Sequence, residues 1–295
     1  MSALHLGETK KYSMQVRRKI ESVFFKSLMI VATAIIAGSL IMIVWTIASK
    51  GLHSLTWDII SKVPEGGFYI GKGGGILNAI IGSLYISIGA TVLGLAISIP
   101  VVLYVNVYAK RNSFFANTTR LMFDVLFGIP SIVYGAFGFT IMVYFGLKES
   151  LLAGIITVTL LVIPILARAM DEVVRLAPTE LSDATYSLGS TRWETSLILL
   201  RQAVPGILTA ILLSFGRAIG DAATVLFTAG YTDSIPTSLN QPTATLPLAI
   251  FFQLSSPIEE VQDRAYAAAL ILTFIVLVIS LSAKYFSKKY SKHKI

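Results

Sequence analysis

Two residues of opposite charge stand inside a long apolar stretch of this sequence. Arg217 and Asp221 lie within residues 204–228 and are four positions apart. On an α-helix this spacing places both side chains on one face, close enough to pair. A guanidinium can donate two parallel hydrogen bonds, which match the geometry of a tetrahedral oxyanion such as phosphate. The pair is therefore a candidate anion-binding site on a substrate pathway.

The same two residues also have a purely structural interpretation. A charge at the centre of a bilayer costs at least about 2.5–3.5 kcal/mol, so charged residues in membrane spans usually face a cavity or a partner. Arg217 and Asp221 could satisfy one another and do no more than hold helices together. Asp124, near the start of another apolar stretch, is the remaining ionisable residue at such depth. Spacing alone leaves both interpretations open.

The composition indicates that the whole chain lies in a membrane. Of its 295 residues, 55% are hydrophobic and 14% are charged, and the mean hydropathy is +0.75. A soluble domain carries about 25% charged residues, so this chain has too few to cover a surface in water. A helix of about 20 apolar residues crosses the hydrocarbon core. We therefore expect an all-α polytopic membrane protein with six transmembrane helices, at about 27–49, 77–105, 121–145, 150–170, 204–228 and 266–286.

The basic residues predict how the chain is oriented. Most of the 24 Lys and Arg residues fall in the segments before, between and after the spans that share one side of the membrane. The positive-inside rule places that side in the cytoplasm. The expected organisation is a cytoplasmic N-terminal tail at 1–26, a permease domain at 27–286 with a cytoplasmic loop at 171–203, and a basic cytoplasmic tail at 287–295. The net charge of +8 is thus an orientation signal, and nucleic-acid binding is not expected.

No residue pattern in the chain suits a metal or nucleotide cofactor. Cysteine is absent and the three histidines are scattered, which excludes thiol chemistry and a histidine metal site. Gly66, Gly71 and Lys72 satisfy most of the phosphate-binding P-loop pattern, but Gly73 stands where Ser or Thr would ligate magnesium. We expect no cofactor in this chain, so that any ATP and magnesium must be bound by another subunit.

The loop at 171–203 is predicted to form two short helices. Pro178 suits a first helical turn and Gly189 suits the position after a helix end. Thr191 and Glu194 have the spacing of a capping box. The first helix would carry an apolar stripe. This stripe favours either a docking surface for another protein or a helical hairpin on the membrane, and its members are Leu181, Ala184, Thr185 and Leu188.

Other features inside and outside the spans favour a transporter over a simple anchor. Pro100, Pro130 and Pro164 lie at membrane depth, where broken helices are tolerated if they line a cavity or find partners. Gly216 and Gly220 form a small-xxx-small step that permits close helix contact. In the long outer loop at 229–265, the apolar residues 246–252 predict a short interfacial or re-entrant helix.

Four segments resemble a known family. They are GGILNAIIGSLY at 74–85, PSIVYGAFG at 130–138, APTELSDATYSLGSTRWET at 177–195 and PGILTAILLSFGRAIGDAATVLFTAG at 205–230. From about residue 17 to 285 the chain is similar to the PstA family, the permease subunits of the bacterial and archaeal phosphate ABC transporter. The resemblance implies the type I ABC importer permease fold with a cytoplasmic EAA-type coupling helix.

The resemblance also assigns roles to residues. The family's functional arginine falls on Arg217, and Asp221 stands where relatives usually carry Glu. The positions of the ATPase-coupling loop fall on Glu180, Asp183, Ala184, Thr185, Leu188 and Gly189. Here Asp183 replaces the motif's Glu, Thr185 replaces its second Ala, and the proline expected after Leu200 is Arg201.

By the same resemblance the chain is not an enzyme but half of a phosphate pathway in the cytoplasmic membrane. Its implied partners are a homologous PstC-like permease, two copies of a PstB-like ATP-binding subunit and an extracytoplasmic PstS-like phosphate-binding protein. A permease for sulfate, molybdate or tungstate is the alternative within the class. An ion-coupled transporter would show internal repeats and more buried acids, and an intramembrane enzyme would need paired carboxylates or a nucleophile with its base.

Overall fold

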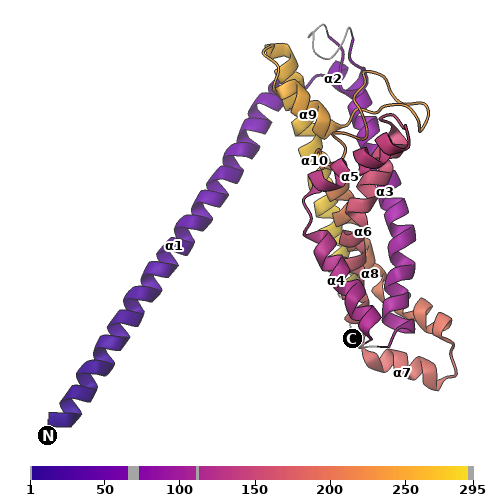
Figure 1. Cartoon of the computed structure of the whole chain (residues 1–295). Coiled ribbons are helices and arrows are strands. Elements are labelled where there is room, and N and C mark those ends of the chain that lie inside the picture. Colours follow the sequence, from indigo (N-terminus) through magenta and orange to yellow (C-terminus); the bar gives the residue numbers. More distant parts are fainter. Residues whose placement is uncertain (1, 66–72, 111–112, 292–295) are drawn as a thin grey trace. The chain divides into compact units, whose positions relative to one another are not determined.

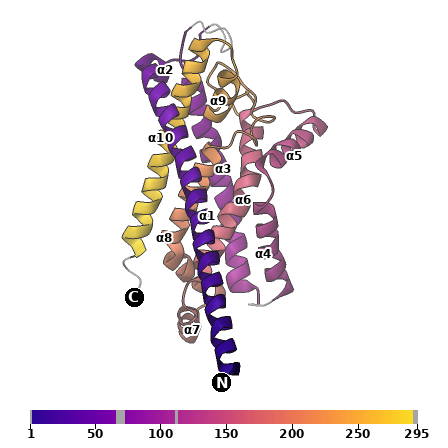
Figure 2. The ribbon, with the colours of Figure 1, turned by 90° about the vertical axis from the view of Figure 1, so that its left-hand side faces the viewer.

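A computed structural model gives the structure of the protein (Figures 1 and 2). It describes residues 2–65, 73–110 and 113–291, with side chains for 18–65, 73–110 and 113–289. Within these residues the regular structure is entirely helical, apart from one isolated antiparallel bridge between Pro64 and Gly74. The predicted all-α fold class is therefore confirmed.

The chain divides into two compact units, Met1–Ser49 and Lys50–Ile295. The first unit is part of a single helix, α1 (Ser2–Ser54). This helix continues without a break through residue 26, so the described residues of the predicted N-terminal tail are helical. Residues 292–295 of the predicted C-terminal tail lie outside the described residues.

The second unit contains the remaining helices. In chain order they are α2 (Trp57–Ser61), α3 (Leu77–Leu103), the π-helix η1 (Tyr104–Tyr108), α4 (Phe114–Phe127), α5 (Ser131–Tyr144), α6 (Leu151–Arg175), α7 (Thr179–Ser187), α8 (Arg192–Ile219), α9 (Leu246–Leu254) and α10 (Glu259–Ser291). In both views α2 and α9 lie at one end of this unit and α7 lies at the opposite end (Figures 1 and 2).

The core of the second unit forms around α6, which packs against α3, α4, α5 and α8. Val158, Val162 and Leu166 on α6 are fully buried. Lipid tails are as apolar as these side chains, so close packing rather than water exclusion holds membrane helices together. A Cβ atom added at Gly94 of α3 would lie 3.1 Å from Leu166, which shows how closely the two helices approach.

In the described part of the chain, five helices are long and apolar enough to cross a membrane. They are Arg18–Ser54, Leu77–Tyr108, Leu151–Arg175, Arg192–Ile219 and Glu259–Lys289. The pair α4 and α5 gives a sixth crossing if the two helices together count as one span. These features are those of a polytopic membrane protein.

The span predicted at 121–145 is broken into α4 and α5, which meet at an angle of 97°. Pro130 has no N–H group and its ring disfavours helical backbone in the residue before it, so the helix stops there. The break leaves carbonyl groups without a helical partner. The Tyr134 hydroxyl donates to one of them, the Leu126 carbonyl, at 2.8 Å. In contrast, Pro100 and Pro164 lie inside α3 and α6.

The helix predicted to fill residues 204–228 is displaced along the chain. It begins at Arg192 and ends at Ile219, and residues 220–229 form turns without a helix. The predicted second short helix of the 171–203 loop is therefore the first part of the long α8. The chain leaves the helix at Gly220 because Asp221 bonds to the backbone of the following turn, which competes with helical bonding.

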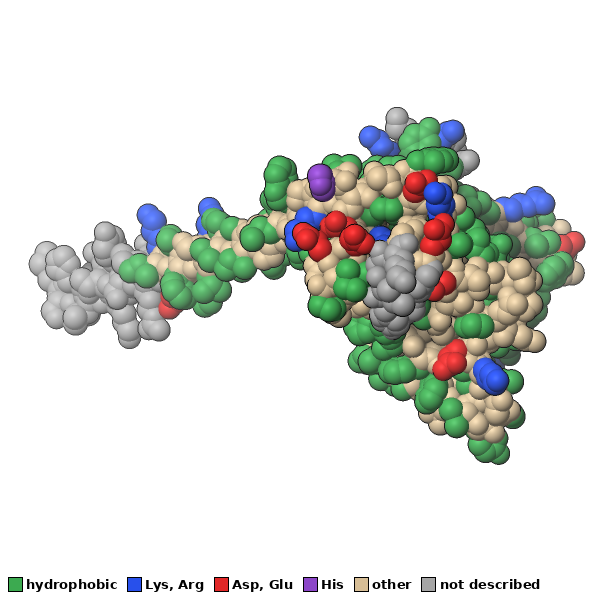
Figure 3. Space-filling model, turned by 90° about the horizontal axis from the view of Figure 1, so that it is seen from above, with side chains coloured by type: hydrophobic (Ala, Val, Ile, Leu, Met, Phe, Trp, Pro, Cys, Tyr) green, Lys and Arg blue, Asp and Glu red, His purple; other side chains and the backbone are tan. Residues whose placement is uncertain are grey.

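The predicted short helix at 246–252 is present as α9, which buries one face and exposes the other, where Phe251 is 54% exposed. Thr245 caps it, its side chain accepting from the Leu248 N–H at 3.4 Å, and Leu246 and Leu248 are fully buried. The helix packs against α10 and α3. Figure 3 shows the end of the molecule near α2 and α9, where acidic side chains are visible; the exposed acids of this region include Asp58, Glu65, Glu259 and Glu260.

Candidate functional site

The predicted ion pair between Arg217 and Asp221 is present. Arg217 lies on the last turn of α8, and its Nη2 atom is 3.3 Å from Asp221 Oδ1. The two side chains differ sharply in exposure, because 51% of the Arg217 side chain is accessible but only 3% of the Asp221 side chain. The carboxylate is thus a fixed, buried group, whereas the guanidinium reaches out from it.

Asp221 also organises the turn that follows α8. Its second oxygen, Oδ2, accepts a hydrogen bond from the Thr224 backbone N–H at 2.8 Å. A carboxylate that accepts from a backbone N–H three residues later caps the turn in the way that an N-cap residue caps a helix. One buried carboxylate therefore positions both the Arg217 side chain and the backbone of residues 221–224.

This turn packs directly against the second half of the bent pair, α5. The Thr224 hydroxyl donates to the Ser131 carbonyl at 3.2 Å. A Cβ atom added at Gly135 would lie 2.6 Å from the Ala223 carbonyl oxygen, so only glycine allows this approach. The rings of Phe139 and Phe227 lie 6.0 Å apart. The segments PSIVYG and GDAATVLFTAG, which are far apart in the sequence, form one structural unit around the ion pair.

The geometry leaves the arginine able to bind an anion. Among the described residues, Asp221 is the acceptor for the Arg217 guanidinium, and the contact uses one nitrogen atom of the arginine, Nη2. A guanidinium carries five N–H donors in a planar fork, so further donors remain for another acceptor. An oxyanion that accepts two of them would form the charge-assisted bidentate contact that arginine favours.

The predicted capping box in the 171–203 loop is present. The Thr191 side chain accepts from the Glu194 N–H at 3.3 Å, and Glu194 Oε2 accepts from the Thr191 N–H at 2.7 Å. Pro178 precedes α7 as predicted, and Gly189 has a φ of +82° just after its end. These local signals place a nine-residue helix, α7, immediately before the long α8.

The residues predicted to couple to an ATPase do not all face the same way. Thr185 is buried, and its hydroxyl lies 3.2 Å from that of Thr195 on α8. Leu188 is 87% exposed. The others at the surface are Glu180, Asp183, Ala184 and Gly189. Thr185 thus fixes α7 to α8, and the remaining predicted residues form an exposed surface at the end of the molecule opposite α2 and α9.

A buried polar network on the α7 side was not foreseen from the sequence. The Arg120 Nε atom lies 3.0 Å from Asp171 Oδ2, and Asn106 Nδ2 donates to Asp171 Oδ1 at 2.7 Å. Asp171 is fully buried. In the sequence, Arg120 is one of the basic residues that indicate the orientation of the chain, and nothing near it indicates Asp171 as its partner. Its partner is 51 residues away in the sequence, and no local pattern indicates that distance.

Asp124 also has a partner that the sequence did not indicate. Its Oδ1 atom lies 3.2 Å from the Arg168 Nε atom of α6, in a pair whose side chains are both about half exposed. This contact joins α4 to α6. It gives a partner to Asp124, which, like Arg217 and Asp221, was predicted to lie inside a span. In contrast, Gly66, Gly71 and Lys72 of the rejected P-loop pattern lie outside the described residues.

A bundle of membrane-length helices with a broken helix pair, an ion pair at a helix break and an exposed short helix at one end is the architecture of a multi-pass transport permease. A family model described as "Binding-protein-dependent transport system inner membrane component" matches residues 90–292. The chain belongs to this family of inner-membrane transport components. It is therefore a non-enzymatic component of a transport system.

Curated relatives extend the match over most of the chain. A "Phosphate transport system permease protein PstA" from Yersinia pestis is 36% identical over 252 residues, which cover 85% of this chain and 84% of that protein. "Phosphate transport system permease protein PstA 2" from Mycobacterium bovis is 30% identical over 271 residues, covering 90% of this chain and 88% of that protein.

Solved structures support the fold independently. A chain of the MetNI methionine ABC transporter, in an inward-facing conformation, superposes with a TM-score of 0.59 at 19% identity. The match covers 72% of this chain and 95% of that chain. At this level of identity the superposition shows similarity of fold alone. The shared fold is that of an ABC importer permease.

Proposed function

We propose that this chain is the permease subunit of an ATP-driven phosphate importer and forms half of the pathway for inorganic phosphate. The observation that carries the proposal is the half-exposed Arg217, held by the buried Asp221 at the point where α8 ends. A phosphate anion would accept two hydrogen bonds from the free donors of the guanidinium. The names of the curated relatives support phosphate as the anion.

The other half of the pathway would come from a homologous, PstC-like permease. Asp221 would hold Arg217 in place when no anion is bound and compete with phosphate for it as the anion passes. A PstS-like binding protein would deliver phosphate at the end of the molecule that carries α2 and α9. This orientation places the N- and C-termini in the cytoplasm, as the positive-inside rule requires.

Two copies of a PstB-like subunit would bind ATP and magnesium, so that this chain itself needs no cofactor. One ATPase would contact the exposed surface of α7 formed by Glu180, Asp183, Ala184, Leu188 and Gly189. ATP binding can shift the transporter between inward- and outward-open states only if the ATPase binds those two states with different affinity. Thr185 supports this coupling by joining α7 to α8.

The proposal is tested by uptake of radiolabelled phosphate in cells that lack their own high-affinity system. The chain is supplied with its neighbouring subunits, and a variant with an inactive ATPase is the control. We expect ATP-dependent uptake that excess sulfate or molybdate does not reduce. If sulfate or molybdate inhibited uptake, the chain would still be a permease of this architecture, but its substrate would be another oxyanion.

Arg217→Ala and Arg217→Lys separate the two interpretations of the ion pair. Losing a charged hydrogen bond of about 1.5–3 kcal/mol predicts a decrease in uptake of roughly tenfold or more for Arg217→Ala. Arg217→Lys keeps the charge without the fork, so uptake should recover only in part. The transporter complexes that contain either variant should assemble normally. Loss of assembly in Arg217→Ala would make the arginine a structural residue.

A further inference from the structure

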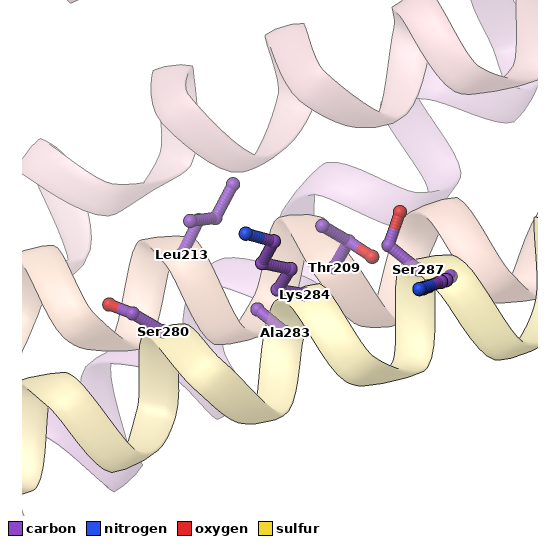
Figure 4. Close-up of a pocket in the computed structure, with 7 residues that line it drawn as sticks. Thr209, Leu213, Ser280, Ala283, Lys284 and Ser287 are labelled. Atoms are coloured by element: carbon purple, nitrogen blue, oxygen red, sulfur yellow. The ribbon is translucent and has the colours of Figure 1, made fainter.

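A groove of about 630 Å³ lies between α8 and α10, and neither Arg217 nor any residue of α7 lines it. Figure 4 shows its walls, which are formed from one side by Thr209 and Leu213 of α8 and from the other by Ser280, Ala283, Lys284 and Ser287 of α10. Lys288 completes the lining. The groove thus combines small polar groups and two lysines with an apolar wall.

The position of Lys284 along α10 fixes the depth of the groove in the membrane. Every residue from 265 to 283 is uncharged, and Arg264 and Lys284 flank this stretch. As a helix it is about 28 Å long, which matches a hydrocarbon core of about 30 Å. Lys284 therefore lies at the level of the lipid headgroups, at the end of α10 that shares the α7 end of the molecule.

The two lysines of the groove are free to bind an anion. They are four residues apart on a helix, so they share one face. Both are exposed, and in the described part of the chain neither lies in an ion pair. Figure 4 shows the Lys284 ammonium group directed back toward Leu213, beside the apolar wall. Lys289, the next basic residue, instead lies over the Tyr285 ring at 5.9 Å from its centre.

We propose that this groove binds an anionic phospholipid of the leaflet at the α7 end, the cytoplasmic leaflet in the proposed orientation. Lys284 and Lys288 would pair with the headgroup phosphate, and the Ser287 hydroxyl would donate to it. An acyl chain would lie along Leu213 and Ala283. Basic pockets between transmembrane helices on the cytoplasmic side bind anionic headgroups in this way, and a free phosphate ion would gain nothing from the apolar wall.

A photo-crosslink from inside the groove identifies its occupant. Leu213 is replaced by p-benzoylphenylalanine in the assembled transporter, reconstituted in vesicles of phosphatidylglycerol and phosphatidylcholine in a ratio of one to three. After irradiation we expect an added mass equal to that of phosphatidylglycerol. A crosslink to another subunit would overturn the proposal and make the groove a subunit interface.

The charge requirement is measured by native mass spectrometry of the purified complex. Lys284→Gln combined with Lys288→Gln should decrease retention of phosphatidylglycerol by about tenfold or more, since each basic residue near an anionic surface contributes about 1 kcal/mol. Lys19→Gln combined with Lys289→Gln removes two charges that do not line the groove and should retain the lipid. Equal loss in both double variants, or displacement of the lipid by millimolar inorganic phosphate, would contradict a lipid-specific groove.

Discussion

Arg217 and Asp221 form an ion pair in which one partner is open and the other is enclosed. The arginine side chain is half exposed, whereas the carboxylate 3.3 Å away is buried and also binds the Thr224 N–H. Removing the Arg217 side chain removes a charge that water can solvate. Removing the Asp221 carboxylate also leaves a buried backbone N–H without its acceptor. The two positions should therefore respond differently to substitution.

Asp221→Asn and Asp221→Ala should separate the pairing of Arg217 from the capping of the turn. Asparagine keeps an oxygen that can accept from the Thr224 N–H, so we expect a melting temperature close to that of the unmodified complex and reduced phosphate uptake. Alanine leaves that buried N–H without an acceptor, which costs about 1–3 kcal/mol. Thermal unfolding and uptake are measured on the same preparations, with Asp221→Glu as the charge-conserving control. Equal melting temperatures for Asn and Ala would show that the cap does not matter.

The contact between α5 and the turn after α8 predicts a specific effect at Gly135. In Gly135→Ala the new methyl group would lie 2.6 Å from the Ala223 carbonyl oxygen, so α5 must move away and the complex should lose stability and transport. Overpacking of this kind typically costs about 1–3 kcal/mol. Gly128→Ala is the matched control, because its nearest neighbour would be at an ordinary 3.4 Å. A normal melting temperature for Gly135→Ala would show that the approach of α5 is looser than described.

The buried network at Asp171 predicts strong coupling with Arg120. Removing one member of a buried ion pair leaves an unpaired charge and costs about 3–5 kcal/mol. Arg120→Leu and Asp171→Leu should each destabilise the complex strongly, and the double variant should cost much less than their sum. The measurement is a double-mutant cycle of thermal stability. Additive effects would mean that the two residues stabilise the fold separately.

The exposed surface of α7 predicts a defect in coupling without a defect in folding. Leu188→Asp places a charge on a side chain that is 87% exposed, so the permease should keep its melting temperature. If that surface contacts an ATPase, stimulation of ATP hydrolysis by the loaded binding protein should be lost. Leu176→Asp, at a leucine that is 70% exposed on the same side of the membrane but lies outside α7, is the control. Retained stimulation in Leu188→Asp would exclude this residue from the coupling contact.

Local sequence signals predicted local structure well. The capping box at Thr191 and Glu194, the turn at Gly189 and the pairing of Arg217 with Asp221 each depend on residues within four positions, and all three are present. The all-α fold followed from hydropathy, because a backbone in lipid must satisfy its own hydrogen bonds. The roles of Arg217 and the α7 residues stay predictions until transport is measured.

Features that depend on contacts between distant segments could not be predicted. Nothing near Arg120 in the sequence indicates that its partner is Asp171, because only the packing of α4 on α6 brings them together. The end of α8 was missed for a related reason. Most of residues 222–227 are apolar and continue the pattern of the span, and it is the bond from Thr224 N–H to Asp221 that turns them out of the helix. Pro130 was recognised as a helix breaker, but a proline does not give the angle of the break.

The long helix α8 connects the α7 end of the molecule directly to Arg217. The capping box that follows α7 and the arginine at the other end belong to one helix, and the 25 residue steps from Arg192 to Arg217 correspond to about 38 Å. A rod of that length converts rotation into displacement: a tilt of about 5° at the α7 end moves the arginine end by about 3 Å, the length of one hydrogen bond. No chain of intermediate residues is then needed to relay a signal. If α8 moves as one rigid body, a displacement of α7 reaches Arg217 directly, and Pro205 is the position along the helix where one backbone hydrogen bond is missing.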